Sequence, residues 1–226
     1  MARILSIETS TAVLSVALAQ DGTVVAERVC TEARQQAALT APLVKEVLDA
    51  AGVRMSGCDA VCVSAGPGSY TGLRVGVSTA KGLAFGAGIP LIALGTLDIL
   101  VAGVENRGSY KYIVPMIDAR RMEVYTAVFA PDGTALTPVQ AMVVGEHSFD
   151  TWLSEGPVLF VGDGALKCRE VLQHPSAQFL EAAPLACHME PLAEEAFRAG
   201  KFADVAYFEP FYLKDFVATV SKKQLW

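Results

Sequence analysis

A pattern of three strands that occurs twice along the chain constrains the fold more than any other feature of the sequence. In the first half, RILSIET, TAVLSVALA and TVVAERV predict three strands, and Asp21-Gly22 predicts a tight turn between the second and the third. In the second half, KYIVPMID, ARRMEVYTAVFA and TALTPVQAMVV repeat this order, with Asp132-Gly133 at the same turn. The first strand of each copy ends on an acidic residue, Glu8 or Asp118. The shared order, turn and acidic residue indicate an internal duplication.

Alternating helix and strand signals follow each copy. Residues 34–52 predict a helix that ends at Gly52, and the apolar run 60–66 is typical of a buried parallel strand. After the second copy, PVLFVG predicts a strand and MEPLAEEAFRAG a helix. The sequence therefore predicts an α/β fold of two similar subdomains. We place them at residues 1–106 and 107–226, and the final segment could pack back on the first subdomain.

Composition and charge exclude several classes of protein. A net charge of −6 at pH 7 argues against an autonomous nucleic-acid binder, because such proteins carry a basic surface. The five cysteines form no C-x-x-C pair and the three histidines are scattered, so we expect reduced thiols and no histidine metal site. Pro90 and several glycines interrupt the most apolar window, 83–104, which argues against a membrane span. The N-terminus has no leader pattern, so the expected location is the cytoplasm.

The glycine-rich stretch 66–84, GPGSYTGLRVGVSTAKGLA, opens with a turn after a predicted strand and supplies the next predicted helix, and phosphate-binding loops also occur at such strand-to-helix turns. A dinucleotide-binding motif would need glycine where Thr71 stands, and a P-loop needs glycine directly before lysine, whereas Lys81 follows Ala80. On a helix, small residues recur at every fourth position: Gly72, Gly76, Ala80 and Ala84. This stripe predicts the close approach of another backbone, either from the chain's own sheet or from a partner.

The glycine-rich stretch resembles the signature of the TsaB family, also called YeaZ, and IETST, DARRMEVY and EPFYLKDF resemble that family too. The resemblance covers nearly the whole chain. It implies the actin-like ATPase superfamily and the class of M22 glycoproteases. The fold it implies is a duplicated actin-like (RNase H-like) α/β fold, with two subdomains of mixed five-stranded sheets flanked by helices.

The function implied by the resemblance is that of a scaffold subunit that is not itself an enzyme. In bacteria the family member pairs with a homologous catalytic subunit, TsaD, and an ATPase, TsaE, joins them to form threonylcarbamoyladenosine on ANN-decoding tRNAs. The expected partners are thus a TsaD-like subunit and a TsaE-like ATPase, with tRNA reached only through the complex. A homodimer is an alternative for the chain alone, and no membrane is expected.

The sequence indicates a degraded nucleotide site. Actin-like ATPases hold phosphates with glycines in two hairpin turns, but the turns here, ETSTAV and DARRMEV, contain none. The carboxylates of Glu8 and Asp118 could still hold magnesium through water, although both residues are at least equally plausible as ordinary strand-end residues. We expect no cofactor, with at most weak residual binding of ATP or ADP with magnesium. The vestigial site comprises Glu8, Thr9, Ser10, Gly66, Gly68 and Asp118.

The sequence also predicts neither a bound metal nor a catalytic residue. In the catalytic relative, paired histidines on a helix bind the metal, whereas the corresponding helix here offers Gln35, Gln36 and Thr40. Neutral amides and a hydroxyl are poor ligands for a transition metal. Two alternatives nevertheless stay open: an active actin-like ATPase or kinase, and an M22-type metalloprotease.

The resemblance places the helix of residues 34–52 and the glycine-rich helix together as the docking surface for the catalytic subunit, within the N-terminal subdomain. Both helices have wide apolar faces, so one side could face the core and the other a partner. The expected interface residues are Leu39, Leu43, Val47, Leu73, Arg74, Gly76, Val77, Ala80, Lys81 and Ala84.

Overall fold

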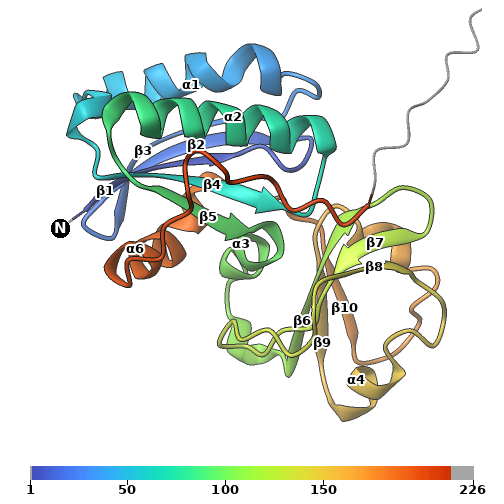
Figure 1. Cartoon of the computed structure of the whole chain (residues 1–226). Helices are drawn as coiled ribbons and strands as arrows, with labels where there is room; N and C mark the ends of the chain where they lie inside the picture. The colour runs from blue at the N-terminus through green and yellow to red at the C-terminus, as the bar shows by residue number, and fades with distance from the viewer. Residues whose placement is uncertain (1, 215–226) are drawn as a thin grey trace, which may run out of the picture.

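Two five-stranded mixed sheets with the same strand order lie side by side in the molecule (Figure 1). The computed structural model describes residues 2–214. The first sheet has the order β3-β2-β1-β4-β5, formed by β1 (Arg3–Glu8), β2 (Leu14–Gln20), β3 (Thr23–Cys30), β4 (Ala60–Gly66) and β5 (Leu91–Gly95). The second has the order β8-β7-β6-β9-β10, formed by β6 (Tyr112–Asp118), β7 (Glu123–Thr126), β8 (Gln140–Val143), β9 (Val158–Val161) and β10 (Ala177–Leu180).

The strand pairing confirms the predicted duplication. In each sheet the first strand of the copy is central: β1 pairs antiparallel with β2 and parallel with β4, as β6 does with β7 and β9. The second copy is less regular, because β8 covers only the end of its predicted strand. Pro138 precedes β8, and proline lacks the N–H that a ladder needs.

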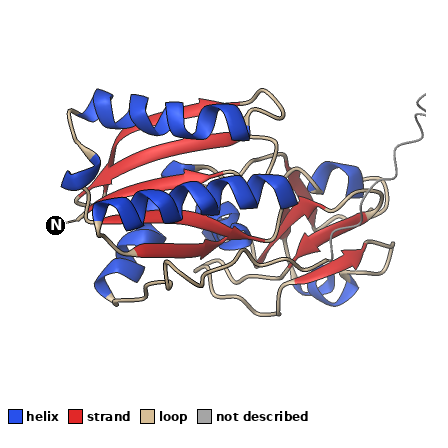
Figure 2. Cartoon of the chain, turned by 45° about the horizontal axis from the view of Figure 1, so that its top comes forward, coloured by secondary structure: helices blue, strands red, loops and turns tan. Residues whose placement is uncertain are grey.

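Helices cover both faces of the first sheet. Figure 2 shows α1 (Gln36–Ala51) and α2 (Tyr70–Ala87) on one face. Helices α3 (Thr96–Ala102) and α6 (Glu190–Arg198) lie on the other face (Figure 1). Successive residues of a strand point to opposite faces, so Leu5 and Ile7 of β1 pack toward α1 and α2, while Ile4 joins the core beneath α6. The second sheet carries the shorter helices α4 (Asp150–Glu155) and α5 (Ala165–Cys168).

Each sheet with the helices that cover it forms one lobe of the molecule. The two lobes meet in a buried apolar contact. Leu97 and Leu100 of α3 pack with Ile113 and Ile117 of β6 in one cluster. The chain thus passes from the first sheet to the second between β5 and β6. The predicted boundary at residue 106 lies in this stretch.

Before α6 the chain has already returned to the first lobe, where the amide of Ala186 donates to the hydroxyl of Ser15 at 2.8 Å. After α6 it stays there, and the amide of Ala203 donates to the carbonyl of Leu91 at 2.8 Å.

No helix in the described part of the chain is long and apolar enough to cross a membrane. All five cysteines are free, as the sequence predicts.

Candidate functional site

A cleft of about 810 Å³ lies between the two lobes. Its walls come from the loop after β1, the start of α1 with the residues before it, the turn between β4 and α2, the loop after β6 and residues 211–214. The structure brings three residues of the predicted vestigial site into this lining: Ser10, Gly68 and Asp118. The other three, Glu8, Thr9 and Gly66, are buried and do not line the cleft.

Glu8 ends β1 and is completely buried. Its Oε1 accepts hydrogen bonds from the amide of Ser10 at 2.6 Å and from the hydroxyl of Ser64 at 3.1 Å, whereas Oε2 has no partner among the described residues. Burial raises the pKa of Glu8 from 4.5 to about 7, and the hydrogen bonds only partly oppose this rise. Because the carboxyl is turned into the protein and easily protonated, it is poorly suited to hold magnesium in the cleft.

A prediction follows for the pH dependence of stability. The folded protein favours the neutral form of Glu8 more than the unfolded chain does. This preference stabilises the folded state fully below pH 4.5, and the stabilisation is lost as the pH rises to about 7. The lost free energy of unfolding is on the order of 3 kcal/mol. Urea titrations at several pH values give the free energy of unfolding as a function of pH. This free energy should change less with pH for Glu8→Gln than for the wild type. Parallel curves for the two proteins would contradict the assignment, and Glu146→Gln at an exposed site is the control.

The small-residue stripe of α2 packs on the loop after β1. The hydroxyl of Thr9 donates to the carbonyl of Gly72 at 2.8 Å. A Cβ added at Gly72 or Gly76 would meet Thr9 atoms at less than any ordinary contact distance, and one at Gly68 would meet Ser10 in the same way. Gly68 and Gly72 therefore make room for the backbone of this loop, and Gly76 makes room for the Thr9 side chain. The close approach comes from the chain itself, although from the loop after β1 and not from the sheet that the sequence analysis named.

Two glycine substitutions on α2 should have opposite effects. Gly76→Ala forces a methyl group against the buried Thr9 side chain, and such overpacking should cost about 2 kcal/mol of unfolding free energy. Gly82→Ala meets nothing within 4 Å and should stabilise the helix by up to about 1 kcal/mol. Chemical denaturation of both variants measures the pair, and equal effects would contradict the proposed packing.

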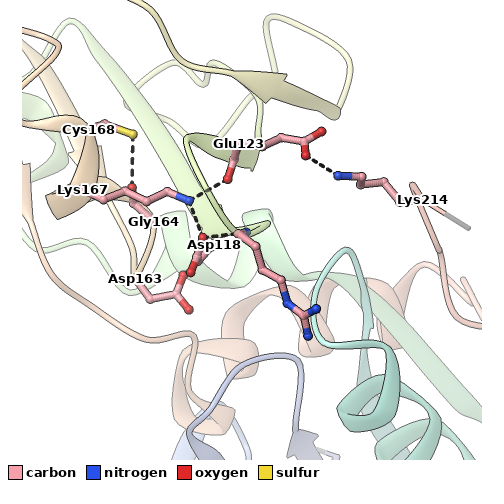
Figure 3. A network of polar contacts seen from close by, with 8 residues as sticks. Asp118, Glu123, Asp163, Gly164, Lys167, Cys168 and Lys214 are labelled. Atoms are coloured by element: carbon pink, nitrogen blue, oxygen red, sulfur yellow. Dashed lines mark hydrogen bonds and ion pairs between the residues drawn. The ribbon is translucent and has the colours of Figure 1, made fainter. Parts of the chain in front are cut away.

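A network of polar contacts holds Asp118 in the second lobe (Figure 3). Its Oδ1 accepts hydrogen bonds from the amide of Arg120, at 2.8 Å, and from the ammonium group of Lys167, with which it forms an ion pair. The same ammonium group donates to the carbonyl of Glu123 at 2.7 Å, and Asp163 accepts from the amide of Asp118 at 2.9 Å. The Asp118 charge is thus already compensated within the protein.

Asp163 and Lys167 are site residues that the sequence analysis missed. Burial raises the pKa of Asp163 above its usual value, which the hydrogen bond from Asp118 only partly opposes. A signal was present in VGDG, where an acidic residue directly follows a buried strand at the same sheet edge as Asp118. Among residues 2–214, no group of three or more His, Cys, Asp or Glu side chains is arranged to hold a metal ion.

The structure corrects the predicted docking surface. Most of the expected interface side chains face the sheet and are almost fully buried, so they cannot present themselves to a partner. Leu43, Val47, Leu73, Gly76, Val77, Ala80 and Ala84 belong to this buried set. Arg74 is exposed, while Leu39 and Lys81 are half-buried, and for these three the interface role stays a prediction.

The outer face of α1 and α2 is instead formed by other residues, and most of them are small. On α1 the exposed residues are Ala37, Ala38, Ala41, Pro42, Lys45, Glu46, Asp49 and Ala50. On α2 they are Thr71, Arg74, Ser78, Gly82, Phe85 and Gly86. Phe85 is 81% exposed, and a Cβ added at either exposed glycine would meet nothing within 4 Å. We call these two sets together the outer helix face.

Comparison with known proteins identifies the family. The family model TsaD, described as tRNA N6-adenosine threonylcarbamoyltransferase, matches residues 18–222. The "tRNA threonylcarbamoyladenosine biosynthesis protein TsaB" of Escherichia coli K12 is 33% identical over 225 residues, which is 96% of each chain. The chain belongs to the TsaB family. TsaB of Bacillus subtilis is 30% identical over 216 residues, which is 93% of each chain.

Solved structures of the TsaB family agree with this fold. YeaZ from Pseudomonas aeruginosa superposes with a TM-score of 0.83 at 28% sequence identity, covering 94% of this chain and 100% of that one. A second crystal structure from Pseudomonas aeruginosa, of a protein with similarity to peptidase YeaZ, gives a TM-score of 0.84 and covers 95% of this chain. The resemblance to TsaB and the predicted duplicated actin-like fold are both confirmed.

Proposed function

We propose that this protein is a non-catalytic scaffold subunit of the bacterial complex that forms threonylcarbamoyladenosine on ANN-decoding tRNAs. The names of its TsaB relatives over nearly the full chain support the pathway. The cleft supports the non-catalytic role, because Glu8 is buried and Asp118 is paired with Lys167. The same features oppose the two alternatives, an active ATPase or kinase and an M22-type metalloprotease. No cofactor is needed, and ATP or ADP with magnesium would bind weakly at most.

In this proposal the outer helix face docks a homologous, TsaD-like catalytic subunit. The observation that carries it is the pair of exposed glycines, Gly82 and Gly86. Glycine inside a helix destabilises it by about 1 kcal/mol relative to alanine. Nothing in the single chain lies near these two positions, so no contact within the fold offsets this cost. A partner backbone that packs closely on α2 would offset it. The exposed ring of Phe85 supports the same face, because aromatic side chains are enriched at interface centres.

The remaining partners follow from this role. A TsaE-like ATPase would join the pair, and the complex would act in the cytoplasm. A protein with a net charge of −6 should bind free tRNA weakly, so tRNA would be reached through the complex. Without its partner, the chain could form a homodimer through the same outer helix face.

Reconstitution tests the function. The isolated chain is expected to show no ATP hydrolysis, threonylcarbamoyl transfer or peptidase activity. Adding it to TsaD-like and TsaE-like proteins of the same organism, with ATP and an activated threonylcarbamoyl donor present, should raise modification of tRNA at least about tenfold, the equivalent of about 1.4 kcal/mol of transition-state stabilisation. Turnover by the chain alone that disappears in Asp118→Ala would instead show that the cleft is catalytic.

A further inference from the structure

Two sequence motifs that docking does not explain meet each other in the fold. The Gly-Pro-Gly turn after β4 lies against the segment 209–214, EPFYLK, at Phe211. The amide of Phe211 donates to the carbonyl of Ala65 at 2.7 Å. A Cβ added at Gly66 would lie only 2.6 Å from the Phe211 carbonyl oxygen, and Gly66 has φ of +109°, where side chains are strained. Gly66 therefore makes room for the segment of residues 209–214.

Further contacts fix the same segment along α2. The ammonium group of Lys81 donates to the carbonyls of Ala206 at 3.1 Å and Phe208 at 2.9 Å. The Tyr212 ring packs on the Tyr70 ring, with 4.7 Å between centroids. In Figure 1 the segment, coloured red, runs from α6 across the first lobe toward β7. Up to Tyr212, it is thus attached to the first lobe.

The segment then crosses the cleft to the second lobe. Residues 211–214 line the cleft, and the ammonium group of Lys214 forms an ion pair with Glu123 of β7 (Figure 3). A second contact between the lobes is the apolar one of α3 with β6. The cleft is thus bordered by an apolar joint between the lobes and by a polar bridge across them.

We propose that residues 206–214 form a clasp that holds the two lobes closed over the cleft, and that the cleft opens by release of this clasp. Release requires little energy, because the contact with the second lobe is a surface ion pair, whose side chains are 42% and 23% exposed. The apolar contact of α3 and β6 stays intact and serves as the hinge. The clasp is independent of the proposed docking and acts in the chain alone.

Distances between spin labels on the two lobes test this inference. Labels are carried by unnatural amino acids at Lys45 of α1 and Thr151 of α4, both exposed. The clasp variant combines Tyr212→Ala with Lys214→Met. The control combines Tyr207→Ala with Lys201→Met: Tyr207 lies on the same segment and is 85% exposed, and Lys201 is also exposed. Pulsed electron paramagnetic resonance then gives the distribution of distances between the labels.

The wild type and the control should share one distribution dominated by the closed state, and the clasp variant should show a larger population at longer distances, by up to about fivefold for the loss of a surface ion pair. Lys214→Met alone removes only the bridge to the second lobe and should show the same shift in part, even if the double variant fails to fold. An unchanged distribution in Lys214→Met and in a folded double variant would overturn the proposal. Equal broadening in the clasp and control variants would overturn it as well.

Discussion

Val77→Glu is expected to unfold the isolated protein. The Val77 side chain is 3% exposed and packs in the core between α2 and the first sheet. A carboxylate at this position would lose its water without gaining a partner, which should cost about 4 kcal/mol or more, a large part of the stability of a typical domain. The thermal melt of the purified variant should collapse or shift far below that of the wild type.

Ser78→Glu is the matched control for this prediction. It introduces the same charge at the next residue of the same helix, but Ser78 is exposed, so the melt should stay close to the wild type. A normal melt for Val77→Glu would contradict the structure, because the residue would then face away from the sheet. The side of α2 that carries Leu73, Val77 and Ala84 would become available to a partner.

The sequence could predict the architecture because its signals are local and occur twice. Each strand order follows from a hairpin with an Asp-Gly turn and from apolar runs long enough for buried strands, as at Ala60–Gly66. The short elements β10 and α4 were not predicted. Each spans only a few residues, so the period of its apolar side chains cannot be established.

The side of each helix that faces the core could not be read from its periodicity. A stripe such as Gly72 and Gly76 only indicates that another segment comes close, and that segment is the loop after β1, where Thr9 meets Gly72 with its backbone and Gly76 with its side chain. On α1, the apolar arc that includes Val44 and Val47 is buried except at its ends, Leu39 and Ala51, because it contacts both the sheet and α2. Polar neighbours are equally hidden from the sequence: the Asp118–Lys167 pair joins two segments that only the second sheet brings together.

Gly82→Arg is expected to abolish docking of the catalytic partner while leaving the protein folded. A Cβ at this position meets no atom within 4 Å, and the arginine replaces a helix-destabilising glycine, so the free energy of unfolding should rise by up to about 1 kcal/mol. In the docked state the same side chain would prevent close approach of the partner helix. A loss of 1,000-fold in affinity, about 4 kcal/mol, is a reasonable scale for a charged side chain forced into a packed interface.

The opposite signs of the two effects make this variant informative. Most substitutions that weaken binding also weaken folding, whereas this one should improve folding and remove binding. Thr151→Arg on α4 is the control, since it adds the same side chain to an exposed helix of the other lobe. The control should keep both the wild-type melt and the partner.

Co-elution of Gly82→Arg with the TsaD-like subunit of the same organism on size exclusion tests the scaffold role most directly. The account predicts a complex peak for the wild type and for Thr151→Arg, and separate peaks for Gly82→Arg, whose melting temperature should equal or exceed that of the wild type. A complex peak for Gly82→Arg at the same concentration would contradict docking through the outer helix face.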